Sequence, residues 1–302
     1  MEENKIIYNG EGERIDIYLK RIYSSFSREF IKKLINSGSI KVNLRQVKPS
    51  FILKDGDEIE IKIDFPQTGL NFSISSIKIY EDDDIIVLNK PAGVLVHPTD
   101  DNWLKDPLAL ELSKDTIAWL LFKEGYGSSD KNLTRLGIVH RLDAMTSGVM
   151  IVTKNSKAQN NITRQFNERI VNKNYKAVVQ GIIEDDFLVI DAPIGRFSGA
   201  KKISVMEYGR DALTEIKKIK CGKKNSYLDV FPKTGRTNQI RVHLSYIKHP
   251  IVGDNIYSNS DYDRLMLHSY KISFIHPSRN KRVEFTVPPD KDFNQRLKKL
   301  LE

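Results

Sequence analysis

Residues 137–154 read GIVHRLDAMTSGVMIVTK, a polar turn that runs into the apolar strand 149–152. Side chains in a loop beside a rigid strand are held in place, and functional sites are often built there. Asp143 lies in this turn, two residues after Arg141. An aspartate close to an arginine in a turn usually has a structural role, through local hydrogen bonds or an ion pair. The pattern alone therefore leaves open whether Asp143 is structural or catalytic.

Short apolar strands separated by turns extend on both sides of this segment from Ile77 onward, and long helices are few. One helix is expected to begin near Ser156, because Ala158, Ile162 and Phe166 recur at helical spacing. The combination predicts an α+β protein whose residues 76–302 form a mixed, mainly antiparallel β-sheet domain. The expected strands are 85–88, 149–152, 175–179, 228–231 and 283–287.

The N-terminal residues 1–66 have a different pattern, in which two short helices precede short strands. The second helix is expected to start at its N-cap, Ser27, and to stop at Gly38. Alternating apolar residues predict strands at 40–42 and 59–63, and Asp55-Gly56 between them indicates a turn. Residues 64–75 contain Pro66 and Gly69 and are predicted to be a linker. We therefore expect a small helix-helix-strand domain ahead of the sheet domain.

Positive charge is concentrated in this first domain. The chain has 302 residues and a formal net charge of +9, which favours an anionic partner. Residues 14–54 contain ten basic and two acidic residues, a local net charge of +8. Arg28, Lys32 and Lys33 are expected to lie away from the apolar stripe of the second helix, where a basic face could meet phosphates. A merely solvated helix would show the same pattern.

The stretch from Gly12 to Ile61 resembles the S4 RNA-binding domain. The similarity rests on the paired helices, the Ser27-Arg28 pair, the Val42-Asn43 segment and the closing Gly56-Asp57. This resemblance implies that Arg28, Lys32 and Lys33 bind RNA.

Composition excludes several classes of protein. With 40% hydrophobic and 29% charged residues, the chain reads as an ordinary globular protein rather than a disordered or membrane protein. The N-terminus MEENKIIYNG has no apolar run after a basic region, so we expect a cytoplasmic protein with no membrane partner. The single cysteine, Cys221, excludes an intrachain disulfide and is expected in an exposed loop.

The segment HRLDAMTSG, residues 140–148, resembles the signature of RluA-type pseudouridine synthases. The resemblance spans roughly residues 76–290 and implies an isomerase that converts uridine in RNA to pseudouridine. Structured RNA is the implied partner, ribosomal RNA rather than transfer RNA, and we expect a monomer. Four further segments follow the order of the family: EDDDIIVLNKPAGVLVHP (81–98), NKNYKAVV (172–179), KTGRTNQIRVHLSYIKHPIVGD (233–254) and RLMLHSYKISFIHP (264–277).

The resemblance also implies roles for individual residues. Asp143 is the catalytic carboxylate, acting as a nucleophile at C1′ or as a base toward a glycal intermediate. Arg241 in the QIR segment is its cationic partner. Tyr175 in the K-x-Y segment stacks on the target base and assists proton transfer. Arg141 enters the space left when the target nucleotide flips out of the helix.

No cofactor or metal is expected. Reactant and product are isomers, so the reaction needs no redox cofactor or activated donor. The chain has no glycine-rich nucleotide-binding loop and no Cys-His ligand cluster. The six histidines show no metal-ligand spacing, and His140 is expected to be a hydrogen-bonding scaffold rather than an acid or base.

The chain departs from the family pattern near the site, which leaves the target uridine open. Ala144 and Met145 stand where relatives often have Lys and Asp, Asn238 replaces the usual His, and residues 100–115 form a longer loop. The main alternative function is a non-catalytic RNA-binding or ribosome-assembly protein on the same scaffold. A glycosidase acting on free nucleosides or sugars is a more remote alternative.

Overall fold

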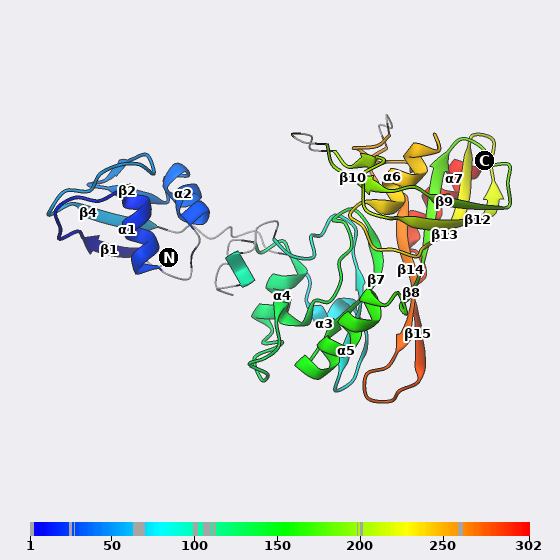
Figure 1. Cartoon of the computed structure of the whole chain (residues 1–302), viewed down its shortest axis with the longest axis horizontal. Helices are drawn as coiled ribbons and strands as arrows, with labels where there is room; N and C mark the ends of the chain where they lie inside the picture. Colours follow the sequence, from blue (N-terminus) through cyan, green and yellow to red (C-terminus); the bar gives the residue numbers. More distant parts are fainter. Residues whose placement is uncertain are drawn as a thin grey trace. The chain divides into compact units, whose positions relative to one another are not determined.

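The computed structural model describes residues 3–23, 26, 28–62, 70–98, 102–104, 110, 113–197, 199, 202–258 and 262–302. The predicted N-cap Ser27, residues 64–69 of the predicted linker 64–75, much of the loop 100–115 and the side chain of Lys33 lie outside this description. The chain divides into two compact units (Figure 1). Unit 1 comprises Met1–Asn71 and His97–Lys123, and unit 2 comprises Phe72–Val96 and Glu124–Glu302.

Unit 1 packs two helices against a four-stranded antiparallel sheet of order β1-β4-β2-β3. The helices α1 and α2 and the strands β2 and β4 confirm the predicted helix-helix-strand pattern. Their apolar residues meet in one core that includes Ile15, Leu19, Ile31, Ile35 and Ile59. The elements are β1 (Glu3–Ile7), α1 (Ile15–Ile22), α2 (Arg28–Asn36), β2 (Ile40–Val42), β3 (Arg45–Gln46), β4 (Glu58–Lys62), η1 (Asn102–Leu104) and α4 (Ile117–Lys123).

Unit 2 is built on a nine-stranded sheet of order β5-β6-β7-β14-β8-β13-β12-β9, with β15 also paired to β14. Only β7 and β14 pair in parallel among the described strands, which confirms the mixed, mainly antiparallel prediction. The strands are β5 (Lys78–Glu81), β6 (Ile85–Lys90), β7 (Ser147–Thr153), β8 (Asn172–Gln180), β9 (Phe187–Asp191), β12 (Leu213–Cys221), β13 (Asn225–Pro232), β14 (Leu267–Ile275) and β15 (Arg282–Thr286). A separate pair joins β10 (Ile194–Gly195) and β11 (Ser204–Val205).

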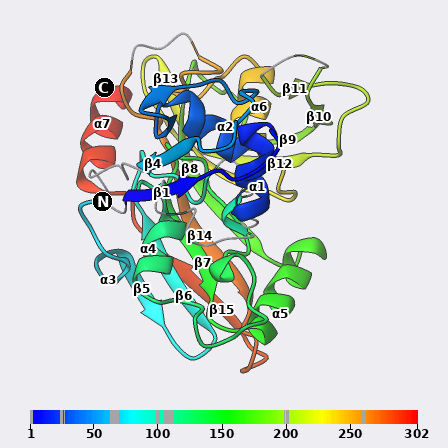
Figure 2. The same cartoon turned by 90° about the vertical axis from the view of Figure 1, so that its left-hand side faces the viewer.

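Helices cover this sheet at separate places (Figure 2). The predicted helix is α5 (Ser156–Asn167), which packs on β7 and β14, and α7 (Lys291–Leu301) packs on β13. The side chain of Asn155 caps α5 by accepting a hydrogen bond from the Ala158 N–H. Neither α7 nor α6 (Gln239–Tyr246) was predicted. The remaining helical segments of unit 2 are α3 (Ile74–Ile77) and η3 (Arg135–Gly137).

Two glycines allow the turn that carries Asp143 to pack closely against neighbouring strands. A Cβ on Gly137 would lie 1.8 Å from the Thr153 carbonyl oxygen, and a Cβ on Gly148 would lie 2.2 Å from the Ser269 carbonyl oxygen. Both glycines also have positive φ, +77° and +112°, which a residue with a side chain rarely adopts. The turn is therefore fixed against β7 at one end and β14 at the other.

The environment of the cysteine differs from the prediction. Cys221 ends strand β12 and is half-buried, with its sulfur 3.7 Å from the Ile183 carbonyl oxygen. Of the charged neighbours that suggested a loop, Lys220 lies in β12 and only Lys223 lies in the turn between β12 and β13. No helix in the described part of the chain is long and apolar enough to cross a membrane.

Candidate active site

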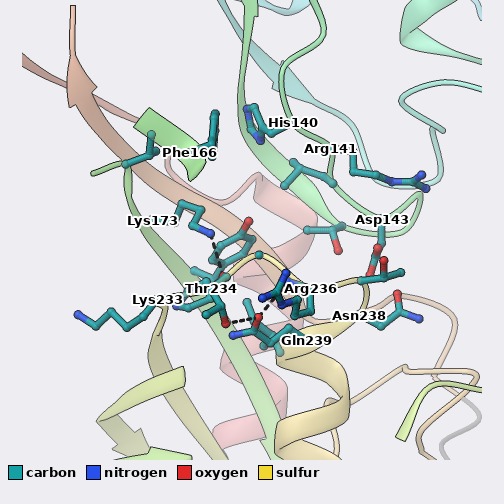
Figure 3. Close-up of a pocket in the computed structure, with 18 of the residues that line it drawn as sticks. His140, Arg141, Asp143, Phe166, Lys173, Lys233, Thr234, Arg236, Asn238 and Gln239 are labelled. Atoms are coloured by element: carbon teal, nitrogen blue, oxygen red, sulfur yellow. Dashed lines mark hydrogen bonds between the residues drawn. The ribbon is translucent and has the colours of Figure 1, made fainter. Parts of the chain in front are cut away.

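A pocket of about 450 Å³ opens in unit 2 beside the turn 137–154 (Figure 3). Its walls come from the turn around Asp143, the end of α5 together with strand β8, the loop that leads into α6 with the start of that helix, and Leu267 of β14. The lining includes Asp143, Tyr175, Arg241 and Arg141, so four of the predicted site residues meet in one cavity. Their side chains come from positions up to 100 residues apart in sequence.

The backbone beside Asp143 is anchored by the segment that follows β6. The Ala144 carbonyl oxygen accepts hydrogen bonds from the Gly93 N–H at 2.9 Å and from Lys90 Nζ at 2.9 Å. Lys90 is fully buried and also donates to the carbonyls of Pro91 and Val94. Burial lowers the pKa of Lys90 to about 7, opposed by the charge of Asp143. The lysine joins the two loops through backbone oxygens.

Arg241 lies on α6 and connects two carboxylates. Its Nε and Nη2 donate to both oxygens of Asp254 at 2.7 and 2.8 Å, and its Nη1 donates to Asp143 at 3.2 Å. The guanidinium also lies 5.3 Å from the centre of the Tyr257 ring. Although burial acts to raise the pKa of Asp254, its hydrogen bonds with Arg241 hold that pKa below the ordinary value. Arg241 is thus fixed by Asp254 and offers a remaining N–H to Asp143.

Sequence reasoning placed Arg241 beside Asp143 but missed Asp254. Asp254 closes the quoted segment 233–254 and is fully buried. A carboxylate inside the largely apolar stretch 250–257 (PIVGDNIY) is the signal that could have found it, because a buried charge needs a partner.

Asn238, one of the departures from the family pattern, contacts Arg241. It precedes α6 in the left-handed conformation, with φ 56° and ψ 18°, which asparagine tolerates better than most residues. Its Oδ1 accepts a hydrogen bond from Arg241 Nη1 at 3.3 Å, and its Nδ2 donates to the Tyr257 hydroxyl at 3.4 Å. Asn238 therefore adds a third support to the arginine.

Tyr175 lies on β8 and is half-buried in the pocket wall. Burial raises the pKa of Tyr175 to about 12, and the charge of Asp143 acts in the same direction against a hydrogen bond with Ser269. Its hydroxyl is consequently protonated at neutral pH and can donate a hydrogen bond.

His140 is held as a neutral ring. Its Nε2 accepts a hydrogen bond from the Ile151 N–H at 2.9 Å, and the ring stacks on Phe166 at 4.9 Å. Burial lowers the pKa of His140 to about 3, and the charge of Lys173 acts in the same direction. These contacts match the expected scaffold role. Arg141, by contrast, is exposed at the edge of the pocket.

The predicted RNA-binding cations of unit 1 take part in ion pairs. Arg28 Nε lies 2.9 Å from an oxygen of Asp16, a fully buried residue of α1, and Lys32 Nζ lies 2.6 Å from Glu29. Their side chains are nevertheless 47% and 33% exposed, so both can still meet a phosphate. The basic face predicted from the sequence is thus partly neutralised.

One group of potential metal ligands was not predicted. Asp82, Asp84 and His276 lie close together in the described structure, although none of them lines the pocket. Asp82 Oδ2 already receives hydrogen bonds from His276, Tyr80 and Arg279. Asp82 and His276 are therefore already bonded to each other. The cluster could not be predicted from the sequence because these two residues are 194 positions apart.

Two regions of the chain match known protein families. Residues 84–246 match the model of the RNA pseudouridylate synthase family, and residues 13–59 match the S4 domain. The chain belongs to the RNA pseudouridylate synthase family, a family of isomerases that act on RNA, and it is of the RluA type.

Individual relatives extend over most of the chain. An uncharacterized RNA pseudouridine synthase of Aquifex aeolicus is 38% identical, covering 94% of this chain and 92% of that protein. Ribosomal large subunit pseudouridine synthase D of Neisseria meningitidis is 33% identical, covering 92% and 76%. Among solved structures, human RNA pseudouridylate synthase domain containing 1 is 28% identical with a TM-score of 0.55, covering 74% of this chain and 86% of that one.

Proposed function

We propose that this chain converts specific uridines in structured ribosomal RNA to pseudouridine, with Asp143 as the catalytic carboxylate. The observation that carries the proposal is the contact of Asp143 with Arg241, 3.2 Å apart, in a pocket shared with Tyr175. Ribosomal RNA is favoured as the substrate because similar proteins are named ribosomal large subunit pseudouridine synthases.

The reaction breaks the N1–C1′ bond, and the bonding electron pair leaves with uracil. The base then turns, C5 bonds to C1′, the C5 hydrogen is lost as a proton, and N1 takes up a proton. An ionised Asp143 either attacks C1′ or removes a proton from the sugar to give a glycal, and both routes need its negative charge. Arg241 orients the Asp143 carboxylate through its hydrogen bond of 3.2 Å.

The other site residues have supporting roles in the proposal. Tyr175 stacks on the target base and assists proton transfer through its hydroxyl. Arg141, exposed at the edge of the pocket, fills the helix space left by the flipped nucleotide. No metal or cofactor takes part.

The two predicted domains have different roles in this proposal. We infer that residues 1–66 bind RNA phosphates through Arg28, Lys32 and Lys33, while residues 76–302 carry out the isomerisation. The enzyme is proposed to act as a monomer in the cytoplasm.

Release of tritium from C5 of uridine tests this function. Ribosomal RNA labelled at C5 and prepared from cells that lack this chain is incubated with the wild type and with Asp143→Asn, which keeps the shape of the carboxylate. We expect tritium in water only with the wild type. Release by Asp143→Asn at the wild-type rate would refute the role of Asp143. Tight RNA binding without any release by the wild type would favour the non-catalytic alternative.

A further inference from the structure

Lys173 is a charged group of the pocket to which the proposed reaction assigns no role. It lies on β8 two residues before Tyr175, and alternate residues of a strand face the same side. Both side chains line the pocket. The Lys173 ammonium points into the cavity from the side opposite Asp143 (Figure 3).

The protein provides few partners for the positive charge of Lys173. Its Nζ donates to the Thr234 carbonyl oxygen at 3.1 Å, and within the described residues it forms no ion pair with a carboxylate. An ammonium has three N–H donors, so this bond leaves capacity for a ligand. Burial lowers the pKa of Lys173 to about 8. A half-buried cation of this kind is stabilised when an anion enters the pocket.

The proposed reaction produces such an anion on the side of the pocket where Lys173 lies. When the N1–C1′ bond breaks, uracil keeps the electron pair, and the negative charge spreads onto its two carbonyl oxygens. Hydrogen-bond donors aimed at developing charge lower the barrier in a site that excludes water. With Asp143 at the sugar, the opposite side of the pocket is where the departing base must lie.

We propose that the Lys173 ammonium donates a hydrogen bond to a carbonyl oxygen of the target uracil and stabilises the uracil anion formed on cleavage. The inference rests on the proposed function and adds a catalytic residue to it. Lys173 stays protonated throughout, so the atoms and protons of the isomerisation balance as before.

Two other roles of Lys173 make different predictions. A contact with an RNA phosphate would change affinity and its salt dependence, because the phosphate carries the same charge before and during the reaction. A purely structural role, bracing the turn at Thr234, would change stability together with activity. Only stabilisation of the uracil anion lowers the chemical rate while affinity and melting temperature stay unchanged.

The pH dependence separates the roles further. Cleavage should slow as pH rises through about 8, where the Lys173 ammonium loses its proton. Burial places the pKa of Tyr175 at about 12 and that of His140 at about 3, so neither titrates in this range. Lys90, outside the pocket lining, has a pKa of about 7, but it titrates in the wild type and in Lys173→Arg alike, so the comparison of these two proteins isolates Lys173. The other charged groups that line the pocket are Asp143, Arg141, Arg169, Lys233, Arg236 and Arg241.

The test compares full-length wild type, Lys173→Met and Lys173→Arg. Lys176→Met serves as the control, because Lys176 is also on β8 but pairs with Asp229 at 2.8 Å and does not line the pocket. Single-turnover tritium release from C5-labelled ribosomal RNA is measured between pH 6 and pH 9.5, with RNA affinity at two salt concentrations and the melting temperature.

We expect Lys173→Met to be slower by about 100-fold, the magnitude typical of a lost donor to a developing negative charge. Lys173→Arg should regain part of the rate and lose the decline near pH 8, because a guanidinium stays protonated. Lys176→Met should match the wild type in single-turnover rate per folded enzyme and in RNA affinity, while its melting temperature falls because Asp229 loses its partner.

A wild-type rate in Lys173→Met would overturn the proposal. So would a loss confined to affinity and salt dependence, or a loss that follows the melting temperature and is equal in Lys173→Arg. If the wild type itself releases no tritium, the proposed function fails instead.

Discussion

Arg241 and Asp254 form a bidentate ion pair, with two hydrogen bonds of 2.7 and 2.8 Å between side chains that are both buried. The backbone N–H groups of Ile256 and Tyr257 also donate to Asp254, which fixes the carboxylate. Asp254 therefore neutralises much of the positive charge of Arg241. Asp143 therefore meets a cation that another residue holds in place and that offers it a single hydrogen bond.

Replacing Asp254 with Asn should impair both stability and activity. Breaking a buried ion pair leaves an uncompensated charge and costs about 3–5 kcal/mol in the free energy of unfolding. The arginine would then turn toward Asp143 or solvent, so the single-turnover rate should fall beyond what the unfolded fraction explains. Urea unfolding and tritium release measure the two effects, and an unchanged rate in the folded variant would contradict the orienting role.

The sequence predicted five of the nine strands of the sheet (β6, β7, β8, β13 and β15) and the residues of the turn at Asp143, but not this support. Helix α6 was missed because residues 239–244 are all buried, so no apolar stripe alternates with a polar face. Asp254 was missed because its partnership with Arg241 spans 13 residues and a turn, a distance that spacing rules for helices and strands do not cover. In unit 1, likewise, the helix pattern revealed Arg28 but not its buried partner Asp16 on another helix.

Gly148→Ala should destabilise unit 2 through a steric clash. The added Cβ would lie 2.2 Å from the Ser269 carbonyl oxygen, and the φ of +112° is unfavourable for alanine. The backbone must shift, which separates β7 from β14 and moves the turn that carries Asp143. We expect a loss of more than about 2 kcal/mol in urea unfolding, with reduced activity.

Gly125→Ala is the matched control for this clash. Gly125 also has a positive φ, +77°, but no atom lies within 4 Å of its added Cβ. It should lose only about 1–2 kcal/mol from the backbone conformation. Equal losses in the two variants would show that the contact with Ser269 is unimportant.

Acid should weaken the cluster around Asp82. Burial acts to raise the pKa of Asp82, but hydrogen bonds from Tyr80, two backbone N–H groups and His276 bring it down from 3.8 to about 2. A carboxyl whose pKa is lower in the folded state stabilises the protein above pH 4, and this contribution is lost as pH falls toward 2. Asp82→Asn should therefore be less stable than wild type at pH 7, and the difference should shrink between pH 4 and pH 3. A constant difference in urea unfolding across this range would argue against the ionised carboxylate as its source.

Asn238→Ala should reduce the chemical rate with little effect on RNA affinity. The substitution removes the amide oxygen that accepts a hydrogen bond from Arg241 Nη1 at 3.3 Å, leaving that N–H group less well oriented toward Asp143. A loss of several-fold in single-turnover tritium release is expected, since a hydrogen bond of this kind contributes about 1 kcal/mol. Asn238→Asp, which keeps the acceptor, should be closer to wild type. Weaker RNA binding at an unchanged rate would instead place Asn238 in substrate recognition.

Lys32 and Arg28 should respond differently to the loss of their charges. Lys32 pairs with Glu29, which is 81% exposed, and surface pairs contribute only about 0–1 kcal/mol to stability. Lys32→Gln should therefore keep the stability but weaken RNA binding and flatten its dependence on salt, by roughly 0.7–0.9 in the slope of log K against log salt for each phosphate that the variant no longer neutralises. Arg28→Gln removes one of the two arginines on the buried Asp16, so it should also lower the melting temperature. RNA binding by Lys32→Gln with wild-type affinity and salt slope would rule out a phosphate-binding role at this position.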